Sequence, residues 1–176
     1  MQVKKVQVGQ LIREAVGEVE DSLTYINPML PFIGEVVVWF NALEADLDEA
    51  VCGLVSTRAA TPGLLIMANT MFQTKLDLFE RLASDWFRSS GTEPSFFKSL
   101  ISELKTCAIL RNKVVHANWL YTNSEGYTEV KIKARNDGII EHEMTKFTTE
   151  NLEEIIERID NSRNLLSELV TDYLPL

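Results

Sequence analysis

Hydrophobic residues recur every three or four positions along most of the chain, which is the spacing of amphipathic helices. Residues 36–40 (VVVWF) could form a strand on their own, but the helical period continues well past them. Prolines at the starts and ends of these stretches interrupt the pattern. The sequence therefore predicts five helices, over residues 5–26, about 32–56, 61–90, about 95–117 and from 148 or 149 to just before Pro175.

A different pattern follows residue 117. Residues 127–133 alternate apolar and polar side chains, and Asn123 and Gly126 lie in the turn before them. This combination predicts a β-hairpin over about 119–134. Asn136, Asp137 and Gly138 mark another turn, and residues 139–147 are expected to add a third short strand.

These elements predict a mainly α fold. We expect an up-and-down bundle of four long helices plus a shorter N-terminal helix, with a small β-hairpin insert at about 119–147. The chain has 176 residues, which is enough for one domain with a sizeable core. It contains no internal repeat, low-complexity segment or linker, so a single domain over residues 1–176 is expected.

Composition narrows the classes of protein. Hydrophobic residues make up 45% and charged residues 24%, as in soluble globular proteins. We see no signal peptide and no apolar run approaching the roughly 18–20 residues of a membrane span, so a cytoplasmic protein without a membrane role is expected. Cys52 and Cys107 lie in apolar helical patterns without metal-type spacing, as reduced core thiols do.

Net charge argues against a generic nucleic-acid-binding module. The chain carries −9 at pH 7, whereas broad electrostatic binding of nucleic acid needs clustered lysines and arginines. An acidic chain can still hold a small basic site. His142, between Glu141 and Glu143, could suggest a metal site with His116, but two distant histidines are thin evidence and no metal is predicted.

Three ionisable residues interrupt the apolar stripes of three predicted helices: Glu44, Lys75 and Arg111. Burying a lone charge costs several kcal/mol, so these stripes make most sense if the charged groups meet. We expect a pair between Glu44 and Arg111. The alternative is that each group lies at a stripe edge and reaches solvent, and Lys75 is equally compatible with that arrangement.

The second feature of this region is the position of His116. Five residues separate it from Arg111, which is about 140° around an ideal helix, so the two do not share a face. Asn112 and His116 are four residues apart and do share one. We expect Arg111 to point inward and the Asn112–His116 pair to face outward near the helix end. The alternative is a surface or capping histidine without chemistry.

Arg111, Asn112 and His116, within Leu110 to Trp119, resemble the R-x4-6-H signature of the HEPN superfamily (higher eukaryotes and prokaryotes nucleotide-binding). The resemblance implies an all-α bundle that pairs as a homodimer or heterodimer and brings two motifs into one cleft. An acidic residue on an earlier helix, here Glu44, agrees with several HEPN groups. The hairpin is not a general feature of the superfamily and would define a subgroup.

The resemblance also implies an activity. Many HEPN proteins are metal-independent endoribonucleases in toxin–antitoxin or other defence systems, so we expect an RNA substrate, a homodimer, an antitoxin partner protein and no cofactor. His116 would be the general acid or base, Arg111 would contact the scissile phosphate, and Asn112 would orient the histidine or the phosphate. Lys113 could add a phosphate contact or be a solvated lysine. The alternative function is a non-catalytic interaction or nucleotide-binding module.

Overall fold

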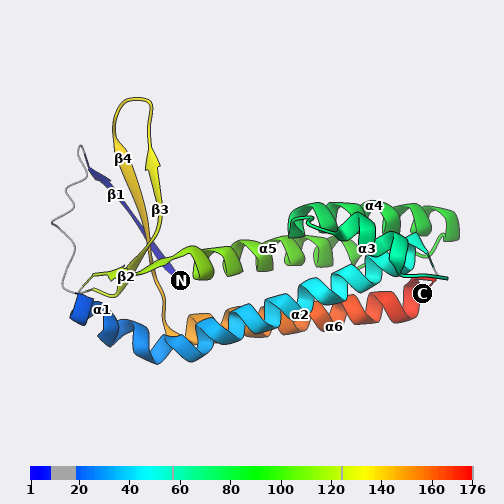
Figure 1. Ribbon diagram of the computed structural model, residues 1–176, viewed down its shortest axis with the longest axis horizontal. Coiled ribbons are helices and arrows are strands. Elements are labelled where there is room, and N and C mark those ends of the chain that lie inside the picture. Colours follow the sequence, from blue (N-terminus) through cyan, green and yellow to red (C-terminus); the bar gives the residue numbers. More distant parts are fainter. Residues whose placement is uncertain (9–18, 57, 124, 176) are drawn as a thin grey trace. The chain divides into compact units, whose positions relative to one another are not determined.

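The computed structural model describes residues 1–8, 19–56, 58–123 and 125–175 (Figure 1). They form a mainly helical fold with one four-stranded antiparallel sheet. The chain divides into two compact units. Unit 1 comprises residues 1–37 with 111–156 and contains the sheet, and unit 2 comprises residues 38–110 with 157–176. A single domain over the whole chain stays a prediction.

Three long helices confirm the helical periodicity: α2 (Leu30–Val55), α5 (Phe97–His116) and α6 (Thr149–Tyr173). Residues 36–40 lie inside α2, as the continuing period predicted. Within unit 2, the buried positions of α2 recur at steps of three and four because one stripe faces the core. These positions are Phe40, Leu43, Leu47, Ala50 and Val51.

The predicted helix over residues 61–90 is wrong as a single element. It is divided into α3 (Thr61–Met67) and α4 (Phe72–Ser90). Asn69 has a φ of 58°, and a right-handed helix cannot continue through a left-handed residue. The Thr70 hydroxyl also donates a hydrogen bond to the carbonyl of Ile66 at 3.0 Å, which completes the end of α3.

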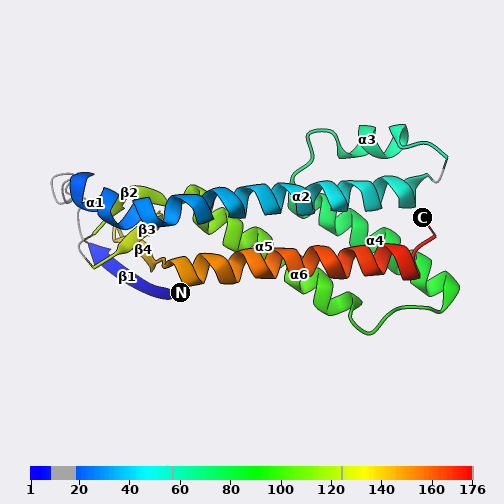
Figure 2. The ribbon, with the colours of Figure 1, turned by 90° about the horizontal axis from the view of Figure 1, so that it is seen from below.

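The short helix α3 lies against α2 (Figure 2). The contact is made at Gly63, where an added Cβ would lie 2.5 Å from the Cα of Cys52. Only a residue without a side chain allows the two backbones to come this close. The absence of a side chain at this position therefore sets the distance between α3 and α2.

The N-terminal helix predicted over residues 5–26 is wrong at its start. Residues Gln2–Val8 form strand β1, and Val19–Ile26 form helix α1, followed by the 3-10 turn Asn27–Met29. The rest of this prediction, residues 9–18, lies outside the described residues. β1 pairs with a strand more than 130 residues later in the chain, and a periodicity confined to the N-terminus does not detect such a partner.

The sheet is larger than the predicted insert. The hairpin β2 (Asn118–Thr122) and β3 (Tyr127–Ala134) and the third strand β4 (Ile140–Lys146) were predicted, and β1 is the fourth strand. The strand order is β1-β4-β3-β2. In this register Glu143 lies opposite both Lys5 and Lys131, so these three side chains share one face of the sheet.

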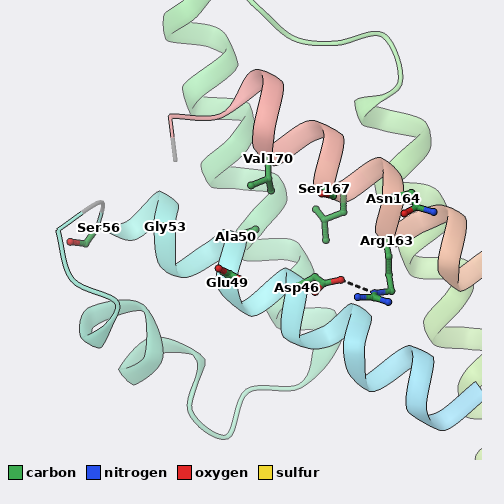
Figure 3. Close-up of a pocket in the computed structure, with 10 residues that line it drawn as sticks. Asp46, Glu49, Ala50, Gly53, Ser56, Arg163, Asn164, Ser167 and Val170 are labelled. Carbon is green, nitrogen blue, oxygen red and sulfur yellow. Dashed lines mark hydrogen bonds and ion pairs between the residues drawn. The ribbon is translucent and has the colours of Figure 1, made fainter.

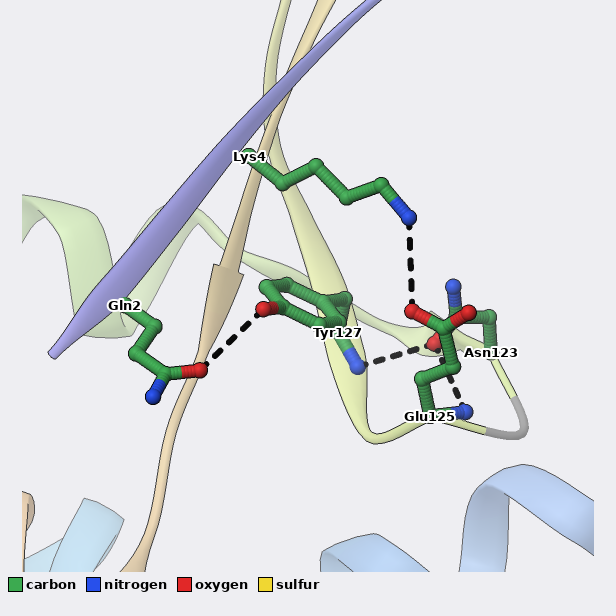
Figure 4. A network of polar contacts seen from close by, with 5 residues as sticks. All are labelled: Gln2, Lys4, Asn123, Glu125 and Tyr127. Atoms are coloured by element: carbon green, nitrogen blue, oxygen red, sulfur yellow. Dashed lines mark hydrogen bonds and ion pairs between the residues drawn. The ribbon is translucent and has the colours of Figure 1, made fainter.

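Strand β1 is held to the sheet by side chains on the opposite face (Figure 4). The Tyr127 hydroxyl donates to the Gln2 side-chain oxygen at 3.2 Å, and the Lys4 ammonium lies 3.3 Å from the Glu125 carboxylate. The Asn123 side-chain oxygen accepts hydrogen bonds from the backbone amides of Glu125 and Tyr127. This turn therefore connects the N-terminal strand to the hairpin.

Among the described residues, one helical stretch, Leu23–Val55, has the length and apolar composition of a membrane span, with a mean hydropathy of 1.3. By this measure of length and hydropathy, the expectation that no apolar run approaches the length of a membrane span is not met. Core helices of soluble proteins pass the same test, and part of α2 supplies the buried stripe of unit 2.

The contact of α3 with α2 generates a prediction. Gly63→Ala should lower the free energy of unfolding by about 1–2 kcal/mol, because the new methyl group meets the Cys52 backbone. The matched control is Gly34→Ala in α2, where an added Cβ meets nothing within 4 Å. That change should raise stability by about 0.5–1 kcal/mol. Urea unfolding of both variants checks this, and equal stability would contradict the tight contact.

Candidate functional site

The predicted motif lies on the last two turns of α5. Arg111 is half-buried, and Asn112 and His116 are exposed, in agreement with the expected outward direction of the latter two. The Arg111 guanidinium donates a hydrogen bond from Nη1 to the Asn112 side-chain oxygen at 3.0 Å. The structure thus brings Arg111 and Asn112 together, one helical turn before His116.

An indole group holds the end of α5. The ring nitrogen of Trp119 donates a hydrogen bond to the backbone carbonyl of Val114 at 2.9 Å, and the ring packs against Phe147 with centroids 4.8 Å apart. The last four carbonyls of a helix have no partner within it, so this bond satisfies one of them. Sequence reasoning missed this cap because the indole belongs to the next strand rather than to the helix.

A second contact ties the same helix to the sheet. Lys113 forms an ion pair with Glu143 of β4 at 3.3 Å, and both side chains are less than a third exposed. Lys113 is therefore not the solvated surface lysine that the sequence left open. Its ammonium is already engaged, and its position fixes the motif-bearing turn of α5 against β4.

In unit 2 the interior charges meet as a group of three. The Lys75 ammonium lies 2.8 Å from Glu44 and 2.7 Å from Asp48, and the lysine side chain is only 9% exposed. The alternative in which Lys75 reaches solvent is wrong. Asp48, which the sequence reasoning missed, lies four residues after Glu44 and so shares its helix face. The expected pair of Glu44 with Arg111 would join the two units and stays a prediction.

The environment of Lys75 decides its charge. Burial by itself would lower the pKa of this ammonium, but hydrogen bonds and charges from Asp48 and Glu44 outweigh burial and raise its pKa. Lys75 therefore stays protonated near neutral pH. A permanently charged, doubly paired lysine is suited to holding helices in place rather than to accepting protons.

The second histidine is engaged elsewhere. His142 Nδ1 lies 2.7 Å from the Glu129 carboxylate, and both side chains are about 15% exposed. This bond joins β4 to β3. In the part of the chain that the structure describes, no group of three or more His, Cys, Asp and Glu side chains is placed to hold a metal ion.

A pocket of about 530 Å³ lies in unit 2 between α2 and α6 (Figure 3). The cation among its lining residues is Arg163, whose guanidinium lies 2.7 Å from the Asp46 carboxylate and 5.4 Å from the centre of the Trp39 ring. None of the residues predicted for the site lines this pocket. The guanidinium is held on two sides, so the cation among the lining residues is already engaged.

Comparison with family models, with curated proteins and with solved structures gave no match for this chain. The similarity to the HEPN superfamily therefore rests on the residues of the motif and on the pattern of helices, and it stays a prediction.

The buried lysine generates a stability prediction. Lys75→Met should lower the free energy of unfolding by about 2–3 kcal/mol, because it leaves Glu44 and Asp48 without their shared cation. The matched control is Lys105→Met, which breaks a more exposed ion pair with Glu80 and should cost less than about 1 kcal/mol. Chemical denaturation measures both. Equal losses of stability in the two variants would show that burial does not strengthen the contacts of Lys75 with Glu44 and Asp48.

The raised pKa of Lys75 also predicts a dependence on pH. A raised pKa in the folded state means that the lysine stabilises the fold fully below its unfolded pKa of about 10.4. This contribution is lost as the pH rises through the pKa that Lys75 has in the folded state. The stability difference between wild type and Lys75→Met should therefore stay constant up to about pH 10 and shrink above it. A difference that grows in alkali would contradict the direction of the shift.

Proposed function

We propose that this protein is a metal-independent endoribonuclease of the HEPN type, with Arg111, Asn112 and His116 in its active site. The observation that carries the proposal is the hydrogen bond between Arg111 and Asn112 one turn before an exposed histidine. The half-buried guanidinium and the exposed imidazole lie on adjacent turns of α5 but on different faces, so the proposal places the phosphodiester in a cleft that a second copy of the chain completes. No metal or cofactor enters this chemistry.

The chemistry assigns a separate task to each side chain. His116 takes the proton from the ribose 2′-hydroxyl, and the 2′-oxygen then attacks the adjacent phosphorus. The bond to the 5′-oxygen breaks, which leaves a 2′,3′-cyclic phosphate and a 5′-hydroxyl. Arg111 stabilises the negative charge that grows on the phosphate oxygens. Asn112 holds the guanidinium through its side-chain oxygen, so it acts as a positioning residue.

The proposal includes a homodimer. The leaving 5′-oxygen needs a proton donor while the 2′-hydroxyl needs an acceptor, and each chain offers one histidine at this motif. Two copies of α5 would supply both groups. Apolar side chains near His116 support this pairing, since Val115, Leu120 and Tyr121 are 36%, 50% and 44% exposed. A second copy would cover them.

The remaining parts of the proposal follow from the same resemblance. The helices would form an up-and-down bundle, and the protein would act in the cytoplasm as a toxin or defence component restrained by an antitoxin protein. The alternative is a non-catalytic interaction or nucleotide-binding module. The exposed apolar side chains beside His116 suit that role too, so cleavage itself has to be measured.

The test is cleavage of single-stranded RNA in the presence of a metal chelator. His116→Ala should slow cleavage by at least about 100-fold, as expected for loss of a general acid or base. His142→Gln changes the only other histidine and should cleave as wild type does. Cleavage by His116→Ala at the wild-type rate would overturn the ribonuclease. Chelator-sensitive cleavage would overturn its metal independence.

A further inference from the structure

Positive charge is concentrated in the sheet of this acidic protein. Residues 2–8 and 118–147 contain six Lys and Arg and five Asp and Glu, whereas the whole chain has 17 and 26. Basic residues are thus not outnumbered in the sheet segments, and α5, which leads into them, has four Lys and Arg against one Glu. Figure 1 shows β3 and β4 as a long hairpin that extends from the end of α5.

The register of the strands collects four lysines on one side. Lys5 and Lys131 lie opposite Glu143, and Lys133 lies opposite Glu141, so their side chains share a face. Lys113 of α5 reaches the same face through its ion pair with Glu143. We call Lys5, Lys113, Lys131 and Lys133 the lysine face.

The carboxylates of this face are already engaged. Glu143 pairs with Lys113 and Glu141 pairs with Lys5, each at 3.3 Å. Lys131 and Lys133 are exposed, and no described acidic side chain forms an ion pair with either. Two residues apart on one strand, they lie about 6.5 Å apart along the chain. The hairpin therefore presents two free ammonium groups in a row.

We propose that the lysine face binds the phosphates of a single-stranded RNA and guides the strand toward His116, an inference that rests on the proposed ribonuclease activity. Lys113 connects the lysine face to His116, because it forms an ion pair with Glu143 of β4 and lies three residues before His116 on α5. Successive phosphates of an extended strand suit a row of ammonium groups. Locally positive potential also raises the association rate of an anionic substrate.

The chemistry of the face favours a polyanion over a membrane. Most of its positions along β1, β3 and β4 are polar, and they include Lys5, Gln7, Lys131, Lys133, Glu141 and Glu143. Val3, which is 50% exposed, is the apolar residue of β1 on this face. A membrane-binding surface needs apolar side chains that enter the headgroup region beside its cations. A mostly polar face with two free lysines suits phosphates instead.

The test measures binding of a labelled single-stranded RNA of about 12 nucleotides to His116→Ala protein, which leaves the RNA intact. Lys131→Gln with Lys133→Gln should weaken binding by about tenfold at low salt. The slope of log affinity against log salt, between about 50 and 200 mM, should fall by about 1.4. The matched control, Arg88→Gln with Lys98→Gln, removes two exposed charges from unit 2 and should change neither.

A charge-preserving variant and a vesicle control identify the cause of any weaker binding. Lys131→Arg with Lys133→Arg keeps the charges and should bind as the parent does, which separates loss of charge from damage to the strand. Equal losses in the glutamine double variant and its control would overturn the lysine face. Binding of phosphatidylserine vesicles through these lysines, without binding of RNA, would overturn it too. The ribonuclease proposal fails separately, if His116→Ala cleaves RNA that the lysine face still binds.

Discussion

A single buried ammonium constrains how the helices of unit 2 can pack. Lys75 of α4 is held by two carboxylates one turn apart on α2, and a buried charge left alone costs several kcal/mol. Sliding α4 by a turn would separate these charges, whereas many apolar contacts could reform in a shifted register. The ring of Phe40 on α2 also packs against the ring of Phe72 at the start of α4, with the ring centroids 4.8 Å apart. Hydrophobic burial stabilises this unit, and the ion group limits its registers.

A comparable constraint operates in unit 1 at the end of α5. Trp119 binds the Val114 carbonyl from one side and Lys113 reaches Glu143 from another. Both contacts use the sheet, so the turn that carries His116 is fixed by strands rather than by its own helix. Its exposure follows from this arrangement. Val114 is fully buried, and Asn112 and His116 occupy positions on the helix that face solvent.

The sequence predicted the long helices because their apolar stripes are continuous over many turns. It failed at Ala68 and Asn69, where the apolar pattern continues on both sides but Ala68 leaves the helical conformation and Asn69 is left-handed. It also failed at β1, whose valines fit more than one period and whose partner β4 is distant in the chain. Periodicity records which side chains are buried, and it does not record which segments pair.

For the candidate site, the sequence identified charged residues without their partners. Glu44 and Lys75 stood out because charges interrupt apolar stripes, but Asp48 did not, since the apolar series continues through the adjacent Leu47. Lys113 was found by its place beside Arg111, and its partner Glu143 depends on strand register. Single residues can be recognised from pattern, whereas ion pairs between distant segments require the fold.

Strand register also shows where a chain with a net charge of −9 presents basic side chains to the proposed RNA substrate. A period of two places Lys5, Lys131 and Lys133 on one face, while Glu141 and Glu143 on the same face are each engaged by a lysine. Averaged over the chain this surface does not appear, because α2 and α6 carry the excess of acid. In the proposed ribonuclease the acidic α2 and α6 would repel an RNA strand, so a strand that binds would do so at the lysine face, which Lys113 joins to the turn of α5 that carries His116.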